Sequence, residues 1–201
     1  MNRTIDEHAA RFDAKAATYD EGDRPIYQAC LDAVIAAANP DPTDVVLDLG
    51  AGTGAIALAL APHAKQVIGR DISEEMLTTA REKAQAQELE NVSFGSGRFR
   101  EPNYDGSVDI ITSNYALHHL DDEAKAEAIT AMAAYEPKRV VLGDLMFFEN
   151  VEPPHPGYDP AVDDPAYVGR LASAFTNAGF VITDVVEFAP HVGVIVARWE
   201  G

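Results

Sequence analysis

The chain has 201 residues, 47% of them hydrophobic and 24% charged, which suits a single globular domain over residues 1–201. Its 33 acidic and 15 basic residues give a formal net charge of −18, a field that would repel nucleic acid and anionic membrane surfaces. We therefore exclude nucleic acid as a partner, and the absence of an apolar run near the roughly 20 residues of a membrane helix excludes membrane insertion.

The single cysteine and the charged N-terminus bear on the compartment. Cys30 has no second cysteine with which to form a disulfide or a thiolate metal site, and residues 1–13 lack the apolar stretch of a secretory signal. We expect a cytoplasmic protein. The acidity fits two interpretations, which the sequence does not separate. One is a protein adapted to concentrated salt, which screens charge repulsion, and the other is an ordinary acidic protein.

Residues 1–40 are predicted to form two helices that cap the core, over residues 5–20 and 25–39. The second begins at Pro25, a residue suited to a first helical turn. From residue 41 the pattern changes to short apolar runs that alternate with helical stretches, which predicts a parallel sheet with helices on both faces. Strands are expected at residues 45–49, 66–71, 91–94, 107–114 and 139–148. Helices are expected at residues 55–64, 73–87 and 121–135, with Ser73 as an N-cap.

The end of the chain breaks this alternation. Residues 152–165 contain five prolines and are predicted to form a surface loop on the substrate side. Residues 179–199 hold two strand-like runs with a short turn around Pro190, and so short a connection makes the two strands antiparallel. The predicted fold is α/β, a doubly wound Rossmann-like sheet of seven mostly parallel strands with an antiparallel last strand and helices on both faces.

The stretch VVLDLGAGTG, residues 45–54, places three glycines within five positions at the end of a strand. In an open parallel sheet, ligands bind at that edge, where the strand order reverses. Asp71 ends the next strand about 21 positions after Gly50, the distance at which an acid accepts hydrogen bonds from ribose hydroxyls. Gly50, Gly52 and Ala55 also satisfy the dinucleotide pattern G-x-G-x-x-A. A P-loop is excluded. Three interpretations of the glycine loop remain open: a dinucleotide site, a site for another adenosine-bearing cofactor, or a turn without a ligand.

The motifs in chain order resemble those of class I S-adenosylmethionine-dependent methyltransferases. VLDLGAGTG resembles their first motif, in which an acid ends the strand two residues before the first glycine. RFDAKAATYD resembles the opening of the small-molecule branch, which is typified by ubiquinone and menaquinone methyltransferases. GRDISEEML and VDIITSNYALHHL resemble the second and fourth motifs of that branch, and the closing hairpin resembles its reversed seventh strand. The resemblance extends over nearly the whole chain.

The resemblance implies S-adenosylmethionine as cofactor and assigns a role to several residues. Tyr19 would close over the cofactor or serve only as a packing aromatic, and Asn114 would face the methionine portion and the transferable methyl group. The other implied contacts are Asp48, Gly50, Ala51 and Gly52 at the methionine end, Asp71 at the ribose, and Ile72 on the adenine.

One position departs from the family. Where many relatives have an acid that accepts from the adenine amine, this chain has Arg98, and a guanidinium has no acceptor. The adenine would instead be recognised by backbone or by Ser96, or Arg98 would stack on the ring. A plain surface arginine is the alternative.

The implied reaction is in-line methyl transfer to a small or lipid-like acceptor. Tyr115, His118 and His119 follow the fourth predicted strand, and a histidine there could deprotonate an acceptor, although packing or helix capping is the simpler interpretation. The catalytic residues are therefore unassigned, with His118 and Tyr115 as candidates. The predicted loop at residues 152–165 would cover the acceptor pocket, with Phe147, Phe148 and Tyr158 as apolar lining of that pocket. His155, Asp159, Asp163 and Asp164 fit no standard ligand spacing, and no metal is assigned.

Two other functions stay as alternatives. A nicotinamide-dependent oxidoreductase is disfavoured because the chain has no Tyr-x-x-x-Lys pair: His119 lies four positions after Tyr115, and Arg139 four after Tyr135. A non-catalytic protein that binds S-adenosylmethionine would keep the same acids and glycines. The sequence specifies neither the acceptor atom nor the oligomeric state.

Overall fold

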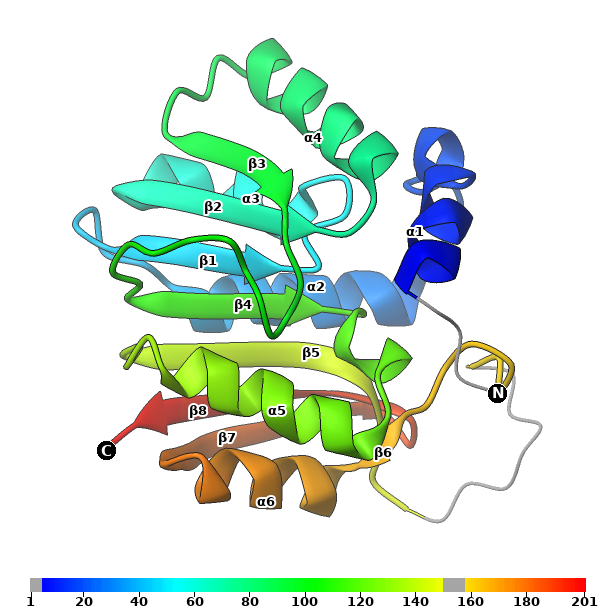
Figure 1. Cartoon of the computed structure of the whole chain (residues 1–201), viewed down its shortest axis with the longest axis vertical. Coiled ribbons are helices and arrows are strands. Elements are labelled where there is room, and N and C mark those ends of the chain that lie inside the picture. Colours follow the sequence, from blue (N-terminus) through cyan, green and yellow to red (C-terminus); the bar gives the residue numbers. More distant parts are fainter. Residues whose placement is uncertain (1–4, 150–157) are drawn as a thin grey trace.

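The computed structural model describes residues 5–149 and 158–201. Its centre is a sheet in the order β3-β2-β1-β4-β5-β8-β7 (Figure 1). β8 is antiparallel to both β5 and β7, and the pairs from β3 to β5 are parallel. The strands are β1 Val45–Leu49, β2 Gln66–Asp71, β3 Val92–Ser96, β4 Ile110–Asn114, β5 Arg139–Phe147, β7 Phe180–Ala189 and β8 Val192–Trp199. The predicted α/β fold with a reversed last strand is confirmed.

An eighth strand adds to the seven that the sequence predicts. β6, Ala166–Tyr167, pairs in parallel with the end of β5, where Met146 lies opposite Ala166. Two residues are too few to show a strand pattern in the sequence. β6 forms because the chain that leaves the proline-rich stretch runs beside the carboxyl end of β5 before α6 begins.

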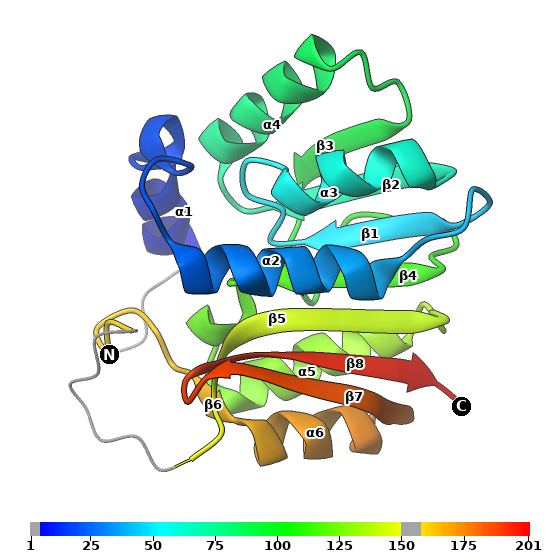
Figure 2. The ribbon, with the colours of Figure 1, turned by 180° about the vertical axis from the view of Figure 1, so that it is seen from behind.

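Helices cover both faces of the sheet (Figures 1 and 2). α2 and α3 pack on one face, where Cys30, Val34 and Ile56 join one buried cluster, and α5 and α6 pack on the other, where Ile129 and Phe175 join a second. β1 is buried along its whole length, which explains its unbroken apolar run. The helices are α1 Ile5–Asp13, α2 Pro25–Ala38, α3 Ala55–Leu60, α4 Glu74–Ala86, α5 Asp122–Ala133 and α6 Val168–Asn177.

Of the two helices predicted as a cap, only α1 stands beyond the carboxyl ends of the strands (Figure 1). α2 instead packs along the sheet and buries Cys30, Leu31, Val34 and Ala38. α1 is also shorter than predicted, because after Asp13 the chain turns into the 3-10 helix η1, Ala16–Thr18. α3 likewise ends early, because Pro62 has no N–H to continue it, and the 3-10 helix η2, Ala61–His63, follows.

Candidate functional site

The glycine loop after β1 turns sharply against its neighbours. The backbone N–H groups of Gly50 and Ala51 both donate to the carbonyl oxygen of Arg70, at 2.8 and 3.0 Å. Gly50 has a φ of +70°, and a Cβ there would lie 2.4 Å from the Cβ of Ala116. Both the conformation and the contact with Ala116 therefore demand glycine at this position.

Gly52 is required for a different reason. Its φ is +52°, but a Cβ there would meet no described atom within 4 Å. The space beside this backbone is open, and it belongs to the cavity described below. Gly52 thus presents bare backbone to whatever occupies the cavity.

Asp71 ends β2 directly beside the loop. Its Oδ2 accepts from the N–H of Gly52 at 2.8 Å and its Oδ1 accepts from the N–H of Ser73 at 2.9 Å. Burial raises the pKa of this carboxyl, although the backbone donors oppose that shift. Each carboxylate oxygen can accept more than one hydrogen bond, so Asp71 is oriented by the backbone and still has acceptor capacity for a ligand.

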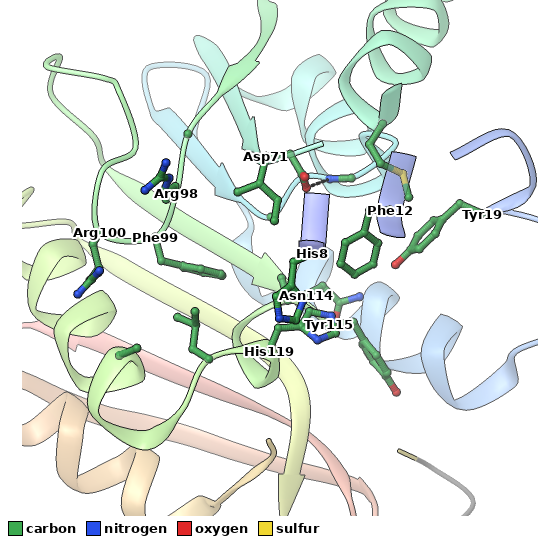
Figure 3. A pocket seen from close by; sticks show the side chains of 18 residues that line it. His8, Phe12, Tyr19, Asp71, Arg98, Phe99, Arg100, Asn114, Tyr115 and His119 are labelled. Carbon is green, nitrogen blue, oxygen red and sulfur yellow. Dashed lines mark hydrogen bonds between the residues drawn. The ribbon is translucent and has the colours of Figure 1, made fainter. Parts of the chain in front are cut away.

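A cavity begins at these residues and continues over the ends of β2 and β4 (Figure 3). Its walls combine apolar and aromatic side chains with a few polar ones. They are formed by His8, Phe12, Tyr19, Gly50, Gly52, Asp71, Ile72, Met76, Gly97, Arg98, Phe99, Arg100, Asn114, Tyr115, Ala116, His119, Leu120 and Ala124. The cavity lies where the strand order reverses, between β1 and β4.

Asn114 supplies an unpartnered donor to this cavity. The Sγ of Cys30 donates to its Oδ1 at 3.3 Å, which fixes the orientation of the amide. Its Nδ2 is buried and has no hydrogen-bond partner among the described residues. A buried donor of this kind is costly unless a ligand uses it, so Asn114 marks a position for a ligand acceptor atom.

Comparison with known proteins agrees with this geometry. Residues 46–135 match the "Methyltransferase domain" family. An uncharacterized methyltransferase of Bacillus velezensis, RBAM_024380, is 30% identical over 164 residues, 79% of this chain and 71% of the relative. The chain belongs to the class I S-adenosylmethionine-dependent methyltransferases. S-adenosylmethionine is the cofactor of that family. The uncharacterized methyltransferase YcgJ of Bacillus subtilis is 42% identical over 100 residues, 49% of this chain but only 40% of the relative's length.

Solved structures share the fold at low identity. Magnesium protoporphyrin IX methyltransferase (ChlM) of Synechocystis, solved with bound S-adenosylhomocysteine, is 20% identical with a TM-score of 0.77, covering 96% of this chain and 95% of that one. The [4+2]-cyclase SpnF is 17% identical with a TM-score of 0.80, covering 98% and 97%. The same fold thus occurs in proteins with different activities.

Three residues that the sequence assigned to the cofactor do not line the cavity of this methyltransferase. Asp48 is 1% exposed and accepts from the hydroxyl of Thr112 at 2.9 Å, and burial raises its pKa to about 7. Ala51 is buried, and Ser96 has an exposed side chain where β3 pairs with Asp71. Arg98 does line the cavity, with its guanidinium 4.0 Å from Glu101.

The first helix of the methyltransferase covers the cavity with residues that the sequence did not single out. His8 and Phe12, four positions apart and therefore on one face of α1, both contact His119, with ring centroids 5.6 and 5.2 Å apart. Tyr19, from the turn that follows η1, also lines the cavity. Burial raises the pKa of Tyr19. The four-residue spacing of His8 and Phe12 predicts that they share one face of a helix, but it does not predict what that face contacts.

The two histidines after β4 lie in different places. They belong to the 3-10 helix η3, Leu117–His119. His119 lines the cavity, whereas His118 is only 5% exposed and does not line it. The Nδ1 of His118 lies 2.5 Å from Oδ1 of Asp144, whose Oδ2 accepts from the His118 backbone N–H at 3.0 Å.

Tyr115 also lines the cavity, with a φ of +53° that is unusual for a bulky side chain. Its ring packs on Tyr27 at a centroid distance of 5.0 Å. Burial raises the pKa of the Tyr115 phenol above its ordinary value. Tyr115 therefore remains protonated at neutral pH and is a hydrogen-bond donor.

The aromatic residues that the sequence analysis expects to cover the acceptor do not line this cavity. Phe147 and Tyr158 contact each other with centroids 5.5 Å apart, but neither they nor Phe148 line the cavity. Residues 152–157 of the predicted covering loop, which spans residues 152–165, lie outside the described residues. Among the described residues, no helix is long and apolar enough to cross a membrane.

Proposed function

We propose that this protein transfers the methyl group of S-adenosylmethionine to a small or lipid-like acceptor. One observation carries the proposal: a single cavity joins the glycine loop and Asp71 to an apolar end formed by Tyr115, His119 and Leu120. The first part suits an adenosine-bearing cofactor, and the second leaves room for a separate molecule next to Asn114. Bound S-adenosylmethionine supplies an electrophilic methyl group on its sulfonium.

The geometry of the walls supports a specific set of cofactor contacts. Asp71 accepts hydrogen bonds from the ribose hydroxyls, and charged bonds of this kind contribute about 1.5–3 kcal/mol. The free Nδ2 of Asn114 donates to the methionine portion, and the open backbone at Gly52 allows the cofactor to lie close. Ile72 packs on the adenine, and Arg98 lies in the wall near it.

The acceptor end is apolar and is covered by α1. Phe12, Tyr115 and Leu120 line the cavity there, and His8 and His119 add imidazoles. The cationic wall residues, Arg98 and Arg100, lie on the chain segment after β3 (Figure 3). An acceptor with an apolar body is therefore favoured over a phosphorylated one. The chain's part in the reaction is to hold the acceptor nucleophile near the methyl group, in line with the bond that breaks.

Cofactor binding is tested by the melting temperature of the protein with S-adenosylhomocysteine, NAD and NADP at matched concentrations. A ligand at a hundred times its dissociation constant stabilises the fold by about 2.7 kcal/mol. We expect a shift with S-adenosylhomocysteine alone, reduced in Asp71→Asn and kept in Glu82→Gln, an exposed position on α4. A shift with NAD or NADP alone would support the oxidoreductase alternative.

Turnover requires a second measurement, because SpnF has this fold and is a [4+2]-cyclase. Incubation with labelled S-adenosylmethionine and a panel of phenols, quinols and fatty acids should give a labelled product that partitions into organic solvent. If the protein binds S-adenosylhomocysteine but transfers no label to any compound of the panel, the non-catalytic alternative is favoured.

A further inference from the structure

Three potential metal ligands meet beside the acceptor end of the cavity. Oδ1 of Asp163 lies 3.6 Å from Nε2 of His118 and 3.3 Å from Nδ1 of His119. One ligand atom of each residue lies within 4.8 Å of the others. The histidines belong to η3 and Asp163 comes from the segment before β6, so the fold brings together groups far apart in the sequence.

The hydrogen bonding of His118 leaves its other nitrogen facing Asp163. Nδ1 lies 2.5 Å from the carboxylate of Asp144, which also accepts from the N–H of Leu145 at 2.8 Å and is thereby held in place. If Nδ1 carries the proton, Nε2 presents a lone pair to the oxygen of Asp163. Two lone pairs repel unless a cation or a proton lies between them. Metal-ligating histidines typically donate their second N–H to a carboxylate in this manner.

The spacing of the three atoms also suits a small ion. Zinc binds histidine nitrogen and carboxylate oxygen at about 2.0–2.2 Å, which places neighbouring ligands of a tetrahedral site roughly 3.3–3.5 Å apart. The two measured separations, 3.6 and 3.3 Å, are close to that value. A further oxygen, the carbonyl of Val162, lies 3.2 Å from Nδ1 of His119. Small rotations of the His118, His119 and Asp163 side chains would bring their ligand atoms to tetrahedral positions around one ion.

We propose that His118, His119 and Asp163 bind a divalent first-row transition-metal ion, with Asp144 as the residue that orients His118. Two imidazoles and one carboxylate favour ions such as Zn²⁺ or Co²⁺ over Mg²⁺ and Ca²⁺, which prefer oxygen ligands. His119 also lines the cavity. If the proposed function holds, the acceptor carries an oxygen or nitrogen atom that ligates this ion, and the ion then lowers the pKa of a hydroxyl that attacks the methyl group.

Metal binding is tested on the full chain without cofactor or acceptor, so that failure of the proposed function does not affect the result. The protein is treated with EDTA, dialysed and titrated with Co²⁺. We expect one bound ion, visible absorption typical of nitrogen and oxygen coordination, and a rise in melting temperature on the order of 5 °C at saturation. Excess Zn²⁺ should remove the absorption, and excess Mg²⁺ should not.

Variants assign the ion to these residues. Asp163→Asn and, separately, His119→Ala should abolish the absorption, and Asp144→Asn should weaken Co²⁺ binding about tenfold to a hundredfold. Asp164→Asn is the matched control, because this neighbouring side chain is exposed. Circular dichroism identifies any variant that fails to fold. Absence of absorption in the parent protein would overturn the proposal. Unchanged binding in both Asp163→Asn and His119→Ala would also overturn it.

Discussion

Asp13 and Ser73 join the first helix to the start of α4. Oγ of Ser73 donates to Oδ1 of Asp13 at 2.5 Å and accepts from the N–H of Met76 at 3.2 Å, so one hydroxyl both caps α4 and holds α1. The N–H of Glu75 adds a longer bond to Asp13, at 3.3 Å. Because α1 carries His8 and Phe12 over the cavity, this contact controls how firmly the cavity is covered.

Asp13→Ala is expected to weaken binding of S-adenosylhomocysteine more than it lowers stability. Asp13→Ala removes the hydrogen bonds from Ser73 and Glu75 to this carboxylate. Bonds to a charged group contribute about 1.5–3 kcal/mol, which corresponds to roughly a tenfold to hundredfold rise in the dissociation constant measured by calorimetry. The melting temperature should change little, because α1 contributes few residues to the buried core. Asp6→Ala, on an exposed position of the same helix, is the control. Equal affinities of the parent and Asp13→Ala would contradict this role.

Gly50→Ala and Gly52→Ala should separate stability from ligand binding. Both place an alanine at positive φ, which costs about 1–2 kcal/mol. Gly50→Ala also forces a Cβ to 2.4 Å from Ala116, so its free energy of unfolding should fall further than that of Gly52→Ala. Gly52→Ala meets no described atom but fills cavity space, so the folded variant should bind S-adenosylhomocysteine at least about tenfold more weakly. Urea unfolding and calorimetry measure the two effects, and a reversed order in either would show that the loop is misassigned.

The sequence was most informative where a feature depends on neighbouring residues. Ser73 caps α4 as predicted, and the hairpin around Pro190 follows from the short connection between β7 and β8. The glycine loop and Asp71 were also predicted, because strand ends and the topological switch point follow from the alternation of elements. These features need only the local pattern and one general rule of open sheets.

The rest of the site depends on contacts that no local pattern encodes. His118 and His119 are adjacent in the sequence, yet one turns toward Asp144 and the other toward the cavity, and only the packing of η3 decides which. The approach of Asp163 to both depends on the path of the segment before β6. The sequence predicts α2 as a cap, but its buried face shows that it packs on one face of the sheet.

Asp48 is expected to make stability decline with rising pH. Burial raises the pKa of this carboxyl from 3.8 to about 7 in the folded protein, so the folded state holds the proton more tightly than the unfolded chain. Its stabilising contribution is complete below the unfolded pKa and is lost as the pH rises through the folded value. Urea unfolding from pH 4 to 8 should therefore show a steeper fall in the parent than in Asp48→Asn. Parallel curves would indicate that Asp48 stays ionised throughout.

Salt should stabilise the protein if its acidity is an adaptation to concentrated salt. The formal net charge of −18 makes repulsion between surface carboxylates large at low ionic strength, and 1 M salt reduces the screening length to about 3 Å. The unfolding midpoint is then expected to rise steadily from low to molar KCl. Simple screening is complete below about 1 M salt. A further rise of the unfolding midpoint in 2–3 M KCl, and not in tetramethylammonium chloride at the same ionic strength, would therefore indicate specific adaptation. A midpoint that does not change with KCl would contradict the adaptation and favour an ordinary acidic protein, in which the negative surface serves solubility alone.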